Sequence, residues 1–167
     1  MGLSSQQEDQ SLIEGLQTVL DGYKGGLAAM LDGIGTTIAY NKIGDMIYRF
    51  IGYEGPWGDN LYWRIFMDPH RRAMYVNWDE LAKFAVGLMR GLYASRKHDT
   101  FYQAMVDDLC GKCPEFRRMW DESAPVGASS IVPSPIHLQV AGFGELRFLS
   151  VRLLIPTREG LALFQRG

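Results

Sequence analysis

The sequence predicts a mixed α+β domain in which a run of helices separates two blocks of strands. Two short apolar segments joined by a glycine-containing turn lie near the N-terminus, helical spacing dominates the middle of the chain, and the segments after residue 135 alternate or run apolar between turns. A chain of 167 residues can bury a core without disulfides. We therefore expect an antiparallel sheet of about five strands, the inserted helices and one further helix at the N-terminus.

The composition excludes several classes of protein. The formal net charge is −2 and the pI is about 5.9, which argues against direct binding of nucleic acid by this chain. No apolar run is long enough to span a membrane, and the N-terminus lacks the pattern of a secretory signal. Two cysteines do not make a disulfide framework. We expect a cytoplasmic protein with no membrane partner.

The first third of the chain predicts a helix, a hairpin and a second helix. The helix covers Gln7–Tyr23, and the two short strands cover Leu27–Asp32 and Thr36–Tyr40. Asn41 is a good N-cap for the second helix. Helical spacing gives that helix the inward face Ile43, Met46, Ile47, Phe50 and Ile51.

Cap and stop signals divide the middle of the chain into four or five helices. Asn60–Met67 ends at an Asp-Pro pair, His70–Tyr75 adds one turn, and Trp78–Tyr93 is the clearest amphipathic helix. Asp99 caps the next helix, and Pro114–Glu122 begins with proline in the first turn. The inward face predicted for the helix after Asp99 is Phe101, Tyr102, Met105, Val106 and Leu109.

The composition changes after residue 122. Ser123–Pro135 is rich in serine, proline, alanine and glycine and is predicted to be a connector. The strands that follow are expected at Ile136–Val140, Glu145–Pro156 and Leu161–Gln165. We expect residues 1–23 to form an arm for linking or dimerisation and residues 24–167 to form one domain.

No catalytic or metal-binding motif stands out. Cys110 and Cys113 have C-x-x-C spacing, but a second metal half-site is missing, and Cys113 is placed to begin the helix at Pro114. The basic cluster Asp68–Arg72 could hold a carboxylate or phosphate, but a solvated helix start is about three times as frequent an explanation. We expect neither an enzyme nor a metal or cofactor site.

Large apolar side chains form stripes on three predicted helices. Such stripes build a core, and they would also line a cavity if the helices around a small sheet left space between them. Ala85 is the small residue on a face otherwise made of large ones, so it is the position that would leave room. The candidate lining residues are Met46, Phe50, Tyr62, Trp63, Phe66, Leu81, Phe84, Ala85 and Leu88.

Three motifs resemble one known family. The segment from Asn60 to Trp78 contains Asn-Leu, Phe-Met-Asp-Pro and Arg72, and it is followed by the Asp99–Leu109 pattern and by Cys113-Pro-Glu-Phe-Arg-Arg-Met-Trp120. In this order and spacing they are similar to the MmyB-like ligand-binding domain of bacterial transcription regulators. The resemblance covers roughly residues 16 to 164.

The resemblance implies a PAS-like sensor that follows an N-terminal helix-turn-helix domain and binds a small apolar ligand, with a fatty acid the expected class. In this sequence only one predicted helix precedes the first strand, so contact with DNA would need a helix-turn-helix domain that this chain lacks. We expect a ligand sensor, with homodimerisation through the first helix left open. Two alternatives remain: a small enzyme acting on a lipid-like substrate, and a protein-interaction module whose core is filled.

Overall fold

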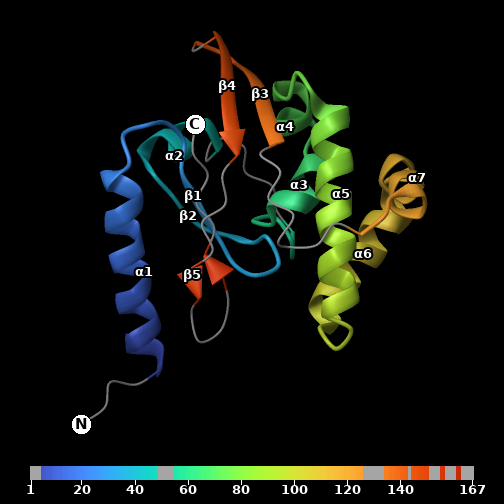
Figure 1. Ribbon diagram of the computed structural model, residues 1–167, viewed down its shortest axis with the longest axis horizontal. Helices are drawn as coiled ribbons and strands as arrows, with labels where there is room; N and C mark the ends of the chain where they lie inside the picture. The colour runs from blue at the N-terminus through green and yellow to red at the C-terminus, as the bar shows by residue number, and fades with distance from the viewer. Residues whose placement is uncertain are drawn as a thin grey trace.

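The computed structural model describes the backbone of residues 5–48, 55–125, 134–142, 144–150, 155–156 and 161–162. The helices are α1 (Ser5–Gly22), α2 (Lys42–Tyr48), α3 (Leu61–Met67), α4 (Pro69–Met74), α5 (Trp78–Ser95), α6 (Thr100–Lys112) and α7 (Pro114–Glu122). The strands are β1 (Ala29–Leu31), β2 (Thr37–Tyr40), β3 (Ser134–Val140), β4 (Gly144–Ser150), β5 (Ile155–Pro156) and β6 (Leu161–Ala162). This confirms the mixed α+β class. In Figure 1, α1 and the α5–α7 group stand on opposite sides, with β1, β2 and α2 between them.

The strands of the described residues form three separate antiparallel pairs, so the continuous sheet of five strands expected from the sequence is not seen. β1 pairs with β2, β3 pairs with β4 over seven residues each, and β5 pairs with β6. Within the segment predicted as one strand, Glu145–Pro156, the described residues belong to β4 and β5, and residues 151–154 lie outside the described residues. The β3–β4 hairpin attaches to helices instead of to β1 and β2, because Leu138 of β3 bridges to Tyr75 at the end of α4.

Asparagine, aspartate and cysteine side chains begin four of the helices. Asn60 caps α3, Asp68 caps α4 and Asp99 caps α6, each by accepting backbone N–H groups of the first turn. Cys113 caps α7, since its Sγ accepts the N–H of Phe116 at 3.4 Å. This confirms the role predicted for Cys113. Asn77, at the start of α5, instead accepts the N–H of His137 and so ties β3 to that helix.

Asn41 holds the segments around α2 together. Its Oδ1 accepts the N–H groups of Ala28 and Gly44, and its Nδ2 donates to the carbonyl of Gly26 at 2.7 Å. The predicted cap is therefore confirmed, and it also fixes the strand before the helix. A Cβ on Gly44 would lie 2.9 Å from the ring of Tyr40. The α2 backbone packs closely on β2 at this glycine.

Two predicted inward faces are partly wrong. α2 buries Gly44, Ile47 and Tyr48, while Ile43 and Met46 are exposed, because the close contact at Gly44 rotates the helix. Phe50 and Ile51 lie outside the described residues. α6 buries the four other predicted residues, but its first-turn Phe101 is 49% exposed, and the centre of its ring lies 6.4 Å from that of Trp57.

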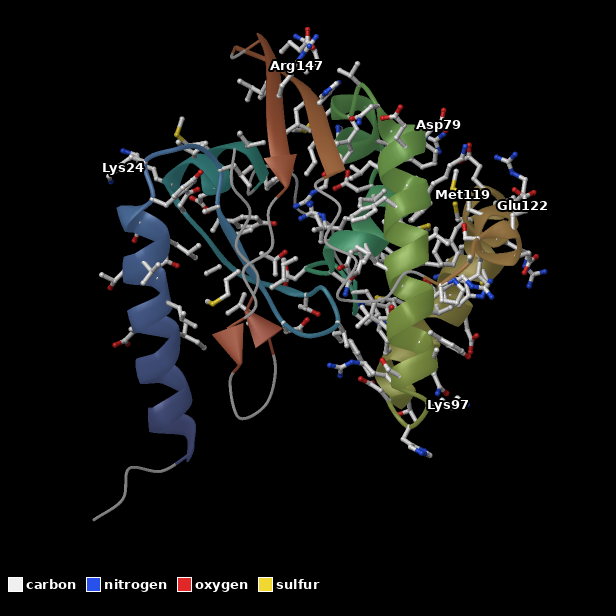
Figure 2. All side chains as sticks on the ribbon, viewed as in Figure 1. Lys24, Asp79, Lys97, Met119, Glu122 and Arg147 are labelled. Atoms are coloured by element: carbon white, nitrogen blue, oxygen red, sulfur yellow. The ribbon has the colours of Figure 1, made fainter. Side chains whose placement is uncertain are left out.

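The main core lies between α3, α5, α6, α7 and the β3–β4 hairpin. A second, smaller cluster packs Leu20 of α1 against Ala28 and Met30. Figure 2 shows that labelled charged side chains such as Lys24, Asp79 and Arg147 project from the outside of the molecule. No helix in the described part of the chain is long and apolar enough to cross a membrane.

Candidate ligand-binding site

A cavity lies where β1, β2, α2, α3, α5 and β3 meet. The volume of the cavity is about 40 Å³, more than the 10–15 Å³ or so that one water needs. Hydroxyl groups of threonine and tyrosine are the polar groups among the side chains around it. The lining residues are Ala29, Leu31, Thr37, Tyr40, Tyr48, Leu61, Tyr62, Ile65, Tyr75, Leu81, Phe84, Ala85, Leu88 and Ile136.

One face of α5 forms a wall of the cavity. Leu81, Phe84, Ala85 and Leu88 recur at i, i+3, i+4 and i+7, so their side chains share one stripe of the helix. All four are among the residues that the sequence singled out. Ala85 is buried and contributes only a methyl group.

The structure divides the three α3 residues named in the sequence analysis between two faces. Tyr62 lines the cavity together with Ile65. Trp63 is the next residue after Tyr62, so its side chain points about 100° away around the helix axis. Its Nε1 donates to Asp108 of α6 at 3.3 Å. Phe66 follows Trp63 by three residues and packs edge-on against Phe116 of α7, with 4.9 Å between ring centroids. Trp63 and Phe66 therefore lie in the core between helices and do not line the cavity.

The predicted contribution of α2 comes from a different residue. Met46 is 45% exposed and is not among the lining residues, and Phe50 lies outside the described residues. Tyr48, at the end of the helix, lines the cavity instead. Gly44 determines this outcome, because its close packing turns the Ile47 and Tyr48 side of the helix inward.

Three tyrosines from separate segments meet at one part of the cavity wall, and apolar spacing in the sequence predicts none of them as lining residues. Tyr40 ends β2, Tyr48 ends α2 and Tyr75 follows α4. The rings of Tyr40 and Tyr48 lie 5.6 Å apart, and the hydroxyls of Tyr48 and Tyr75 lie 3.4 Å apart. Burial, followed by the neighbouring Tyr75, raises the pKa of Tyr48 well above 10.0, so this hydroxyl keeps its proton at neutral pH.

Two arginines near the cavity have carboxylate partners. Arg64 is buried and donates through Nε and Nη2 to Asp68, the Nη2 bond measuring 2.9 Å. Arg72 is partly exposed, makes two hydrogen bonds to Glu115 and stacks over Trp78 at 3.8 Å. These two pairs join α3 to α4 and α4 to α7.

Arg71 differs from both neighbours because it lies among the tyrosines. Its side chain is 0% exposed, its Nη2 donates to the hydroxyl of Tyr40 at 3.0 Å, and its guanidinium lies 4.2 Å from the ring centre of Tyr48. The Nε and Nη1 groups have no hydrogen-bond partner among the described residues. Burial lowers the pKa of Arg71, but Tyr75, Tyr40 and Tyr48 more than offset this, so the pKa is raised and the group stays charged.

The arrangement suits binding of an apolar group beside a buried cation. None of the described lining residues is a histidine, an acid, a lysine or a cysteine, the usual proton-transfer and metal-binding side chains. Across the described residues, no three such side chains gather as a metal site. The solvated helix start expected for the Asp68–Arg72 cluster is wrong for Asp68 and Arg71, which are both buried.

The comparisons with known proteins agree with the motifs in the sequence. The family model described as the MmyB-like transcription regulator ligand binding domain matches residues 12–165. A search of curated proteins found no match. Because the family model covers nearly the whole chain, the resemblance identified from the motifs is confirmed. The chain therefore belongs to the family described as the MmyB-like transcription regulator ligand binding domain.

Proposed function

We propose that the chain senses a small apolar ligand, a fatty acid being the favoured class, and that the cavity beside α5 is where the chain of that ligand binds. The observation that carries the proposal is the apolar lining of this cavity in a domain whose family binds ligands. Each methylene that leaves water contributes about 0.8 kcal/mol before ordering costs, so a long acyl chain has enough apolar surface for stable binding.

The cavity must widen to take such a ligand. A long acyl chain is larger than the 40 Å³ space, so side chains around Ala85 have to move when it enters. Binding would then favour a widened conformation over the compact one, and this difference in affinity is what a sensor requires. The function proposed here is therefore allosteric and not enzymatic.

The N-terminal helix is the proposed route of the signal. Gln17 of α1 donates through its Nε2 to the carbonyl of Tyr40 at 3.0 Å, and the side chain of Tyr40 lines the cavity. A movement of Tyr40 therefore acts on α1 directly. In this proposal residues 1–23 are the arm of the sensor domain, and the exposed side chains of Ile13 and Val19 contact an attached domain or a second copy of the chain.

A thermal melt with sodium dodecanoate tests the proposal. We expect dodecanoate to raise the melting temperature of the wild type, and octanoate to raise it less, because fewer methylenes are buried. Ala85→Leu should reduce the gain, since it fills the space at the α5 wall. Ala82→Leu is the matched control: Ala82 is buried on the same helix but does not line the cavity, so this variant should keep the gain.

Two results would contradict the proposal. If neither carboxylate shifts the melting temperature, and native mass spectrometry finds no bound acyl chain, the domain is better explained as an interaction module with a filled core. If Ala82→Leu and Ala85→Leu reduce the gain equally, the ligand binds elsewhere. Hydrogen exchange of α1 with and without dodecanoate tests the route of the signal, which predicts a change in protection near Gln17.

A further inference from the structure

We propose that Arg71, together with the hydroxyls of Tyr40, Tyr48 and Tyr75, forms an anion-recognition end of the cavity that takes the carboxylate of an acyl ligand. This inference rests on the proposed function and deepens it. It assigns a direction to the ligand, with the head group at the tyrosines and the apolar chain along α5. It also predicts that the domain selects acids over neutral chains of equal length.

The first argument is the missing partner of a buried charge. A guanidinium carries five N–H donors, and the structure satisfies one nitrogen of Arg71, Nη2, with the hydroxyl of Tyr40. Nε and Nη1 have no partner in the described part of the chain although the side chain is completely buried. Buried charges in proteins are normally paired and hydrogen-bonded. A carboxylate in contact with Arg71 would supply both the charge and the acceptors.

The second argument is the contrast with the two nearest arginines. Arg64 has Asp68 and Arg72 has Glu115, each through two hydrogen bonds. Asp68 does not serve Arg71 in the same way: its Oδ2 accepts from Arg64, and its Oδ1 accepts the backbone N–H groups that start α4. Of these three cations, the most deeply buried is the one without a carboxylate.

The third argument is location. Tyr40 accepts a hydrogen bond from Arg71, Tyr48 lies against its guanidinium, and the hydroxyl of Tyr75 lies 3.4 Å from that of Tyr48. The same three tyrosines line the cavity. Arg71 thus contacts two of the tyrosines whose hydroxyls cluster at this part of the cavity wall. Phenol hydroxyls donate hydrogen bonds to carboxylates, and a guanidinium does so with charge assistance. The α5 wall is apolar, so an amphiphile has a polar and an apolar end to match.

Equilibrium binding of dodecanoate and dodecanol, followed by tryptophan fluorescence at pH 8, separates head-group recognition from chain burial. The two probes share a chain, and only one is an anion. We expect the wild type to bind dodecanoate at least about tenfold more tightly than dodecanol. Arg71→Met should weaken dodecanoate to the level of dodecanol and leave dodecanol nearly unchanged. Arg72→Met is the control. It removes a charge from the same helix, but this charge already has a carboxylate partner, Glu115. The variant should therefore keep the preference for dodecanoate over dodecanol.

The outcomes distinguish the two proposals. If the wild type binds neither probe, the proposed function fails. If it binds both equally well, the cavity takes apolar chains and the role of Arg71 is refuted, and this comparison needs no variant. A parallel loss of both probes in Arg71→Met would show that the arginine only supports the fold. Should that variant fail to fold, Tyr40→Phe must reduce the preference for dodecanoate, because it removes the hydrogen bond that the Tyr40 hydroxyl accepts from the guanidinium.

Discussion

Asn41 gives the sharpest prediction about stability, because one buried side chain satisfies three backbone groups in two segments. Asn41→Ala would remove the acceptor of the Ala28 and Gly44 N–H groups and the donor to the Gly26 carbonyl. Asn41 is buried, so water does not replace these bonds freely. Each buried group left without a partner costs about 1–3 kcal/mol, and partial relaxation lowers the sum, so we expect a loss of about 3–5 kcal/mol. Typical domains have only about 5–15 kcal/mol in total.

Urea unfolding at pH 7, followed by the fluorescence of the four tryptophans, measures this loss. Asp99→Ala is the matched control. Asp99 caps α6 through a single N–H, that of Tyr102, at a half-buried position, so its removal should cost about 1 kcal/mol. A cost for Asn41→Ala no larger than that of the control would show that the three bonds do not act together and would refute the reasoning. A change in the m value, the slope of the unfolding free energy against urea concentration, would mean that the substitution had altered the unfolded state instead.

Three further outcomes follow from local geometry. Gly44→Ala should destabilise the domain by about 1–3 kcal/mol in the same urea assay, because its Cβ would lie 3.1 Å from a backbone carbonyl and 2.9 Å from an aromatic ring; a neutral result would show that α2 can shift outward. Without ligand, Ala82→Leu should cost about 1–3 kcal/mol and Ala85→Leu less than about 1 kcal/mol, since only Ala85 borders a cavity, and equal costs would mean that the cavity offers no space. The hydrogen bond from Arg72 lowers the pKa of the partly exposed Glu115 below 4.5, so the pair stabilises the fold above that pH and its contribution is lost as pH falls through the lowered pKa. Glu115→Gln should therefore cost about 0.5 kcal/mol at pH 7 in thermal melts and progressively less as pH falls below 4.5.

The helices could be predicted from the sequence because their signals are local. Asn60, Asp68, Asp99 and Cys113 each act on backbone N–H groups within three residues, and all four begin the helix that follows them. The helix Pro114–Glu122 was expected with the bounds that the structure gives it. Apolar spacing on α5 likewise identified its inward face without any tertiary information.

The pairing of strands could not be predicted, because it depends on contacts between distant segments. Nothing in the local pattern of Ile136–Val140 says whether it pairs with β1 or packs on helices. In the structure, His137 exchanges backbone and side-chain hydrogen bonds with Val76 and Asn77, which holds β3 beside α4 and α5. These residues are 60 positions apart, so periodicity carries no information about them.

Faces of short helices were a second source of error, and the reason is geometric. Spacing of three or four residues is satisfied by Trp63 and Phe66 as well as by Tyr62 and Ile65, and in a helix of seven residues both pairs are apolar. The neighbouring helices decide which pair faces the cavity. Asp108 of α6 contacts Trp63, and Phe116 of α7 contacts Phe66, so this pair faces the other helices. Apolar spacing therefore predicts that α3 borders the cavity without identifying which of its residues line it.

Arg71 shows most clearly what composition and spacing miss. Two adjacent arginines after an Asp-Pro helix start are commonly solvated, and one of them, Arg72, is partly exposed and paired with Glu115. Its neighbour points about 100° away on the same turn, and that direction leads into three aromatic rings brought together from β2, α2 and the end of α4. The guanidinium lies over the ring of Tyr48 and donates one hydrogen bond to the hydroxyl of Tyr40, but these aromatic residues supply no carboxylate. The tertiary fold, and not the local sequence, therefore creates this buried charge, whose Nε and Nη1 have no partner in the described part of the chain. The ligand specificity proposed for it rests on that tertiary arrangement.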